Sequence, residues 1–214
     1  MGVSPWYWWS DVSIKHRSLV GFPKQSEYYH DSPTVRYRGF FLNDEQPVLW
    51  SWAKTYFDTG DKAPFQDKFY AKVFELLLRL KGNYLWPASE VSSFVDGGLS
   101  SCHTVWASMF AVDGRDSTSG SLDSYLAPGP NQILAHEMGI VMGTSHHEPM
   151  SRNQKEWTTW GTGAWDFEKN SEVLTSFWKQ GAERAKGIET VFTVGMRGDG
   201  DLPLDGANLK VSLA

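Results

Sequence analysis

Several features that would point to a particular partner are missing from the sequence. Its 214 residues include one cysteine, Cys102, so no disulfide can form within the chain and the redox compartment stays open. The net charge of −5 and the lack of any lysine or arginine run argue against nucleic acid. No apolar run approaches the roughly 20 residues that cross a bilayer. We therefore expect neither a nucleic-acid nor a membrane partner.

Two sequence signals are also absent. No GxGxxG or Walker sequence opens a helical pattern, which disfavours a nucleotide-binding sheet. The start, MGVSPWYWWSDV, has no basic region followed by an apolar one and is not a signal peptide. Because this start resembles the middle of a protein, we expect a truncated chain. Localisation is left open, and secretion of a full-length protein is one expectation.

Aromatic residues are abundant: the chain has 11 Trp, 8 Tyr and 12 Phe. Sugar sites use such rings, because an apolar ring face stacks on the C–H face of a pyranose. Large aromatic side chains also fill cores and interfaces without any ligand. Composition alone leaves both interpretations open.

Hydrophobic periodicity predicts four strands, two long helices and one short helix. Strands are expected at 35–42, 83–86, 140–142 and 190–196, and helices at 65–80, 131–138 and 166–186. This βαβαβαβ order indicates a parallel sheet with right-handed crossovers. Polar groups follow every strand, which fits a (β/α)8 barrel better than a sheet with one switch point. The predicted fold class is α/β, a partial (β/α)8 TIM barrel of about four βα units with a short β-rich N-terminal segment.

Three polar clusters follow predicted strands. Asn43, Asp44 and Glu45 end the first one, where carboxylates and an amide can bind sugar hydroxyls or transfer protons. An ordinary turn would also explain them.

The sequence MRGDGD ends the last predicted strand. The forked guanidinium of Arg197 suits a ligand carboxylate, and Asp199 and Asp201 can act as acid or base. A surface network of arginine and aspartate in a glycine-rich turn is the alternative.

His146, His147 and Glu148 follow the third strand. Adjacent residues on an extended segment point apart, so their spacing is poor for zinc, and we expect no metal site. Hydrogen bonding to a polar substrate and a structural role both remain open. Trp86, at the end of the second strand, is either a stacking platform or a core residue.

Long motifs around these clusters resemble a known family. PWYWWSDV, YRGFFLNDEQP, FELLLRLKGNYLWPA, EMGIVMGTSHHEPMSRNQKEW and ETVFTVGMRGDGD are similar, in the same order, to glycoside hydrolase family 115, the xylan α-1,2-glucuronidases. The resemblance implies a TIM-barrel enzyme that removes (4-O-methyl)glucuronic acid side chains from xylan with inversion and without a cofactor. The implied partners are glucuronoxylan or aldouronic acid oligosaccharides. The resemblance also allows homodimers of full-length members.

The resemblance assigns roles to the clusters. It implies catalytic roles for Asp201 and Asp44, and contact of Arg197 with the uronate carboxylate. The remaining matched positions are expected to bind substrate: Asn43, Glu45, Trp86, His146, His147, Glu148 and Asp199. A second catalytic carboxylate of the family lies on a later strand, beyond Ala214.

The resemblance also divides the chain. Residues 1–34 are expected to end a preceding domain or linker, and 35–214 to form the N-terminal half of the catalytic barrel. Segments 89–106 and 115–129 lose periodicity and resemblance, so they are expected to be insertions. We expect such a fragment to be inactive alone, because half a barrel leaves strand edges unpaired. The alternatives are a non-catalytic carbohydrate-binding fragment and a metal-dependent barrel hydrolase.

Overall fold

A computed structural model describes residues 4–8, 15–21, 23–24, 27, 29, 31–42, 48–57, 65–87, 129–146, 148–152, 157, 161–198 and 203–204. Several predicted features lie outside these residues. They are Asn43, Asp44, Glu45, His147, Asp199 and Asp201, together with the expected insertions apart from Gly129. No helix in the described part of the chain is long and apolar enough to cross a membrane.

Four parallel strands form one sheet in the order of the chain. They are β1 (Gly39–Phe41), β2 (Tyr84–Trp86), β3 (Val141–Gly143) and β4 (Thr190–Val191). In register, Phe40 pairs with Leu85, Leu85 with Met142, and Met142 with Thr190. The predicted parallel α/β fold is therefore confirmed. Within these four strands the order never reverses, so they contain no switch point of the doubly wound kind.

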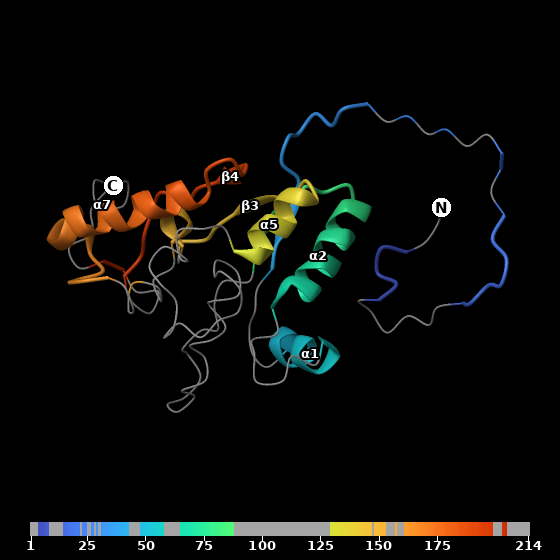
Figure 1. Cartoon of the computed structure of the whole chain (residues 1–214), viewed down its shortest axis with the longest axis horizontal. Coiled ribbons are helices and arrows are strands. Elements are labelled where there is room, and N and C mark those ends of the chain that lie inside the picture. Colours follow the sequence, from blue (N-terminus) through green and yellow to red (C-terminus); the bar gives the residue numbers. More distant parts are fainter. Residues whose placement is uncertain are drawn as a thin grey trace.

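Among the described residues, the crossovers contain four α-helices. α1 (Val48–Phe57) and α2 (Asp67–Arg79) join β1 to β2, α5 (Pro130–Glu137) precedes β3, and α7 (Phe167–Arg184) precedes β4. A short 3-10 turn, η2 (Pro149–Ser151), follows β3. Figure 1 shows α1, α2 and α5 gathered beside the strands, and α7 at the other end of the molecule.

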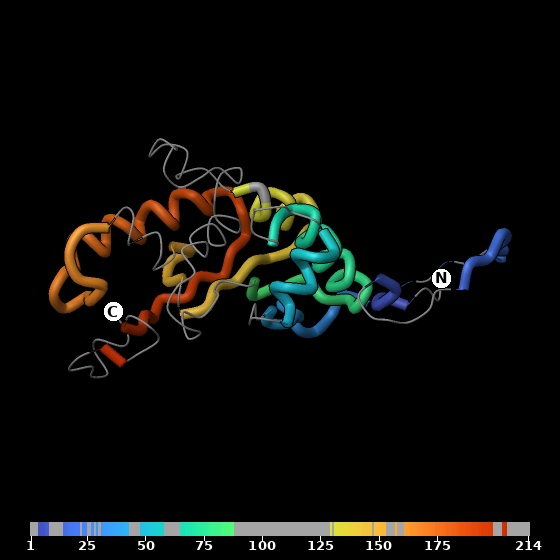
Figure 2. Tube along the Cα trace, turned by 90° about the horizontal axis from the view of Figure 1, so that it is seen from below, coloured from blue at the N-terminus to red at the C-terminus, as the bar shows by residue number. Residues whose placement is uncertain are grey.

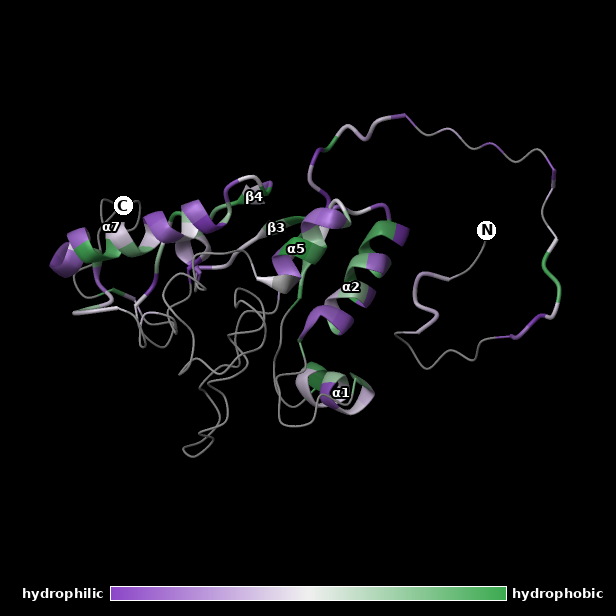
Figure 3. Cartoon of the chain, in the orientation of Figure 1, coloured by the Kyte–Doolittle hydropathy of each residue, from purple (hydrophilic) through white to green (hydrophobic). Residues whose placement is uncertain are grey.

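The main core lies between β2, β3 and three of the helices. Leu85 and Met142 point to the same face of the sheet and are buried. The helices cover this face with Phe69, Tyr70, Val73, Phe74 and Leu77 of α2, Ala53 of α1 and Ala135 of α5. Figure 3 shows α2 divided into a hydrophobic and a hydrophilic side, as its periodicity predicts.

Two strands are shorter than predicted because other groups bond their flanks. Before β1, the Asn83 side chain accepts from the Arg38 amide at 2.9 Å and donates to the Arg36 carbonyl at 2.9 Å. After β4, the Thr193 carbonyl accepts from the Met150 amide at 2.9 Å instead of continuing a regular ladder. Sequence periodicity could not anticipate these bonds, since both join segments far apart in the chain.

One prediction for the N-terminal end finds no support in the described residues. The described residues before Gly39 contain no strand, so a β-rich N-terminal segment is not found among them. Trp8 packs instead against the rings of Trp52, Tyr56 and Phe57 on α1. The segment Val48–Phe57, which contributes three of these four rings, is the helix α1.

Helix α7 buries one apolar stripe. Leu174, Phe177 and Trp178 are buried, whereas Val173 is exposed. The helix is kinked at Asn170, whose side chain donates to the Thr162 and Ala164 carbonyls at 2.7 and 3.1 Å. Its buried residues form a second aromatic cluster with Trp157.

We expect Asp166→Ala to destabilise the protein by about 0.5–2 kcal/mol at neutral pH, because Asp166 caps α7. The carboxylate accepts from the Glu168 amide at 3.0 Å. It also pairs with Lys169 at 2.8 Å, and that hydrogen bond, partly opposed by burial, lowers the pKa of Asp166.

A carboxyl with a lowered folded pKa contributes stability above its unfolded pKa and loses that contribution as pH falls through the folded pKa. Urea denaturation at several pH values should therefore show the difference between wild type and variant shrinking below about pH 4. A difference that stays constant down to pH 3 would contradict this account.

Candidate active site

The face of the sheet opposite the main core carries aromatic side chains. Because side chains alternate along a strand, Phe41, Tyr84 and Trp86 share this face. The Phe41 and Trp86 rings meet edge to face at 5.9 Å, and both side chains are exposed. The helices that cover Leu85 therefore leave an aromatic surface on the other side of β2.

Trp86 is held in place by its neighbours. Its indole Nε1 donates to the Tyr84 hydroxyl, and burial raises the pKa of that phenol although this bond opposes the rise. On β3, Gly143 faces the same pair: a Cβ built there would lie 1.9 Å from Tyr84 Oη and 2.5 Å from two atoms of the Trp86 ring. The missing side chain of Gly143 makes room for the indole and the phenol.

We expect Gly143→Ala to displace Trp86 and to cost about 1–3 kcal/mol of stability, because the new methyl overlaps both rings. Tryptophan fluorescence and a urea unfolding curve measure the two effects. Gly21→Ala is the control, since nothing lies within 4 Å of a Cβ built at Gly21. Unchanged fluorescence and stability in Gly143→Ala would show that the site has room for a methyl group.

Near the amino ends of the strands, one contact spans this face of the sheet. Tyr37, which precedes β1, donates to Glu189 Oε1 at 2.7 Å, although Glu189 precedes β4. The Tyr37 hydroxyl, assisted by Arg36, lowers the pKa of Glu189. The outer strands of a flat four-stranded sheet are about 14 Å apart, so these two side chains together bridge nearly its whole width.

The polar turn after β3 is built around a buried carboxylate. Glu148 is 1% exposed, and its Oε2 accepts from the Ser145 amide at 3.0 Å and the Ser145 hydroxyl at 2.7 Å. His146 lies between them in sequence and is half-buried. This geometry favours a supporting role for Glu148, and it leaves His146 nearer the surface.

The segment after β4 runs beside this turn. The Thr193 hydroxyl donates to the Thr144 carbonyl, and Figure 2 shows the continuations of β3 and β4 side by side. Farther along, Trp165 Nε1 donates to the Arg197 carbonyl at 3.0 Å, while the Arg197 side chain is exposed. Trp86 thus ends β2, and His146 and Arg197 follow the carboxyl ends of the neighbouring parallel strands β3 and β4.

The described part of the site contains no metal cluster. Among the described residues, which leave out His147, Asp199 and Asp201, no three or more His, Cys, Asp or Glu side chains gather as metal ligands.

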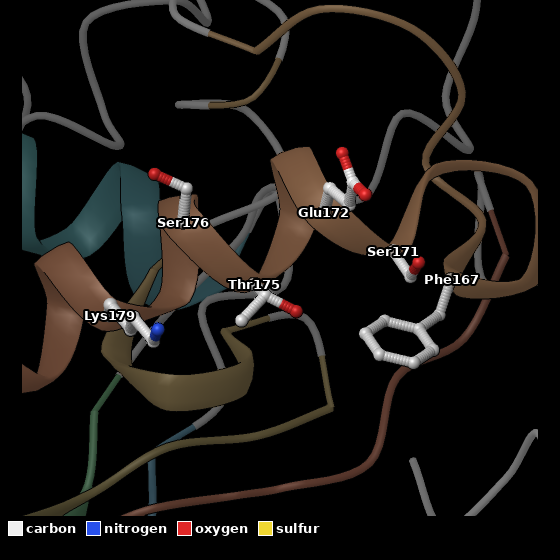
Figure 4. A pocket seen from close by; sticks show the side chains of 6 residues that line it. All are labelled: Phe167, Ser171, Glu172, Thr175, Ser176 and Lys179. Carbon is white, nitrogen blue, oxygen red and sulfur yellow. The ribbon is translucent and has the colours of Figure 1, made fainter.

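Two surface cavities lie elsewhere. One of about 540 Å³ follows the outer side of α7 and is lined by Phe167, Ser171, Glu172, Thr175, Ser176 and Lys179 (Figure 4). Another of about 410 Å³ lies between α2 and α5. Neither is lined by a predicted site residue, so neither is the candidate active site.

Sequence reasoning missed Tyr84 and Gly143 as parts of the site. Alternation along Asn83–Trp86 places Tyr84 on the Trp86 face and could have indicated it. Gly143 could not be found this way, because its role depends on which strand lies beside β2.

This protein is an α/β protein with a parallel sheet, and polar side chains follow its strands β3 and β4. The chain belongs to glycosyl hydrolase family 115, whose family model matches residues 30–213. The resemblance drawn from the motifs is therefore confirmed.

One solved structure similar to this chain is described as "A novel family GH115 4-O-Methyl-alpha-glucuronidase, BtGH115A, with specificity for decorated arabinogalactans". The two share 32% sequence identity and a TM-score of 0.67, with 99% of this chain and 25% of that chain covered. This chain thus spans about a quarter of the length of that protein. No curated protein matches the chain.

Proposed function

We propose that this chain is part of a glycoside hydrolase that removes (4-O-methyl)glucuronic acid side chains from a polysaccharide. The observation that carries the proposal is its 32% identity, over 99% of its length, to a 4-O-methyl-α-glucuronidase of the same family. The exposed aromatic surface of Phe41 and Trp86 supports it, because such rings stack on sugar faces.

We further propose that residues 35–214 form half of a (β/α)8 barrel, after a preceding domain or linker at 1–34. Two observations support this. The strand order follows the chain, and helices cover one face of the sheet and leave the other face to aromatic side chains.

In this proposal the substrate lies at the carboxyl ends of the strands. Asp201 and Asp44 act as acid and base, and an inverting reaction needs such carboxyl groups about 6.5–9.5 Å apart with a water between them. Arg197 binds the uronate carboxylate, and Trp86 stacks on a sugar ring. The other residues with a proposed role in binding are Asn43, Glu45, His146, His147, Glu148 and Asp199.

Two polysaccharide backbones are candidates for the substrate. The sequence motifs suggest xylan, whereas the similar solved structure is of an enzyme described as specific for decorated arabinogalactans. Both carry the same acidic side chain, so the proposal commits to that sugar and leaves the backbone to experiment.

Calorimetry with the purified chain tests the proposal. An aldouronic oligosaccharide and a glucuronate-bearing arabinogalactan fragment are compared with neutral oligosaccharides of the same backbones. We expect the acidic ligands to bind more tightly, because a guanidinium pairs with their carboxylate. Equal binding of acidic and neutral ligands, or no binding, would contradict the proposal. Release of glucuronate, measured in parallel, shows whether the chain acts alone.

A further inference from the structure

The turn after β3 has an unusual backbone. Met150 and Ser151 both have positive φ values, 54° and 57°, although neither is glycine. Such residues are strained and persist only where surrounding contacts hold them, often beside functional groups. Here they follow Glu148 after one residue, Pro149, in the same turn as His146.

Helix α7 supplies a close backbone contact to this turn. A Cβ built at Gly181 would lie 2.1 Å from the Met150 carbonyl oxygen and 2.7 Å from Arg152 Cγ. The turn therefore lies against the helix at a position where only glycine leaves enough room.

A buried arginine on α7 holds the next peptide. Arg184 is 1% exposed, and its Nη2 donates to the carbonyl of Ser151. An arginine is rarely buried so fully unless its bonds are needed. One turn earlier, Gln180 accepts from Arg152 at 2.9 Å, so three residues of the same helix segment meet the turn.

From these contacts we propose that Gly181 and Arg184 are positioning residues for the candidate site. They hold Met150 and Ser151 in the left-handed conformation, and this sets the direction in which His146 and Glu148 leave β3. Neither residue touches the proposed substrate. The expected effect on sugar binding rests on the proposed function, but the effect on His146 does not.

The test compares Gly181→Ala and Arg184→Lys with two controls. Ser176→Ala changes an exposed residue of α7, and Arg79→Lys changes an arginine in the last turn of α2. The readouts are the imidazole NMR signals of His146, assigned with His146→Gln among the six histidines, the melting temperature, and the affinity for an aldouronic oligosaccharide.

We expect the His146 signals to shift in Gly181→Ala and Arg184→Lys but not in the controls. The affinity for the acidic oligosaccharide should fall about tenfold, which corresponds to 1.4 kcal/mol. Glycine to alanine normally stabilises a helix, so a lower melting temperature in Gly181→Ala would itself support the close contact.

The proposal is overturned if Gly181→Ala and Arg184→Lys both melt at lower temperature but keep the wild-type His146 signals and affinity. Gly181 and Arg184 would then only stabilise the fold. If Gly181→Ala does not fold, Arg184→Lys decides by the same readouts. If the wild-type chain binds no acidic sugar, the proposed function fails, and the His146 signals alone decide the positioning role.

Discussion

Replacing Leu77 by alanine is expected to destabilise the protein by about 2–5 kcal/mol, the usual cost of a leucine-to-alanine change in a packed core. Leu77 is 1% exposed and belongs to the cluster that joins α2 to β2 and β3. A domain is typically stable by only about 5–15 kcal/mol, so this one change removes a large share. Equilibrium unfolding in urea measures it.

The neighbouring residue is a matched control. Leu78 has the same side chain on the same helix but is 42% exposed. We expect Leu78→Ala to change stability by about 0.5 kcal/mol or less. Similar losses in both variants would show that α2 does not pack against the sheet through the side that contains Leu77.

The second large effect concerns recognition of the acid. We expect Arg197→Met to weaken binding of a glucuronate-bearing oligosaccharide about 10–150-fold, since a hydrogen bond to a charged group is worth about 1.5–3 kcal/mol. The fold should survive, because the bond from Trp165 reaches the backbone carbonyl of Arg197 and not its side chain. Calorimetry with both acidic and neutral ligands separates a loss of carboxylate recognition from a general change in the site.

Binding of the neutral oligosaccharide should stay unchanged in Arg197→Met. Arg79→Met is the matched control, since Arg79 is a partly exposed arginine that pairs with Glu75 on α2. Equal losses for acidic and neutral ligands would assign Arg197 a general role in shaping the site. Unchanged binding of both ligands would show that Arg197 does not belong to the site.

Much of the fold was predictable from periodicity. The apolar spacing in α2 and α7 and the short apolar runs before Trp86 and Gly143 predicted the helices and the parallel strands. Predictions failed where long-range contacts replaced local preference. Trp8 packs on α1 instead of pairing as a strand, and Asn83 bonds the chain before β1.

The candidate site was only partly predictable. Motifs indicated the clusters after each strand, but they could not separate a buried supporting group such as Glu148 from an exposed one such as Arg197. Burial of a side chain in a turn depends on which helix covers that turn. The residues next to the turn in sequence do not show which helix this is.

By itself, the sequence determined the family and the parallel α/β class, because these follow from motifs and from short-range periodicity. Only the tertiary structure decided how the groups of the candidate site are held. Gly143 makes room for Trp86, Tyr37 reaches Glu189 across the sheet, and the left-handed turn after β3 rests on Gly181 and Arg184. Each of these contacts joins residues far apart in the chain, where sequence patterns carry no geometric information.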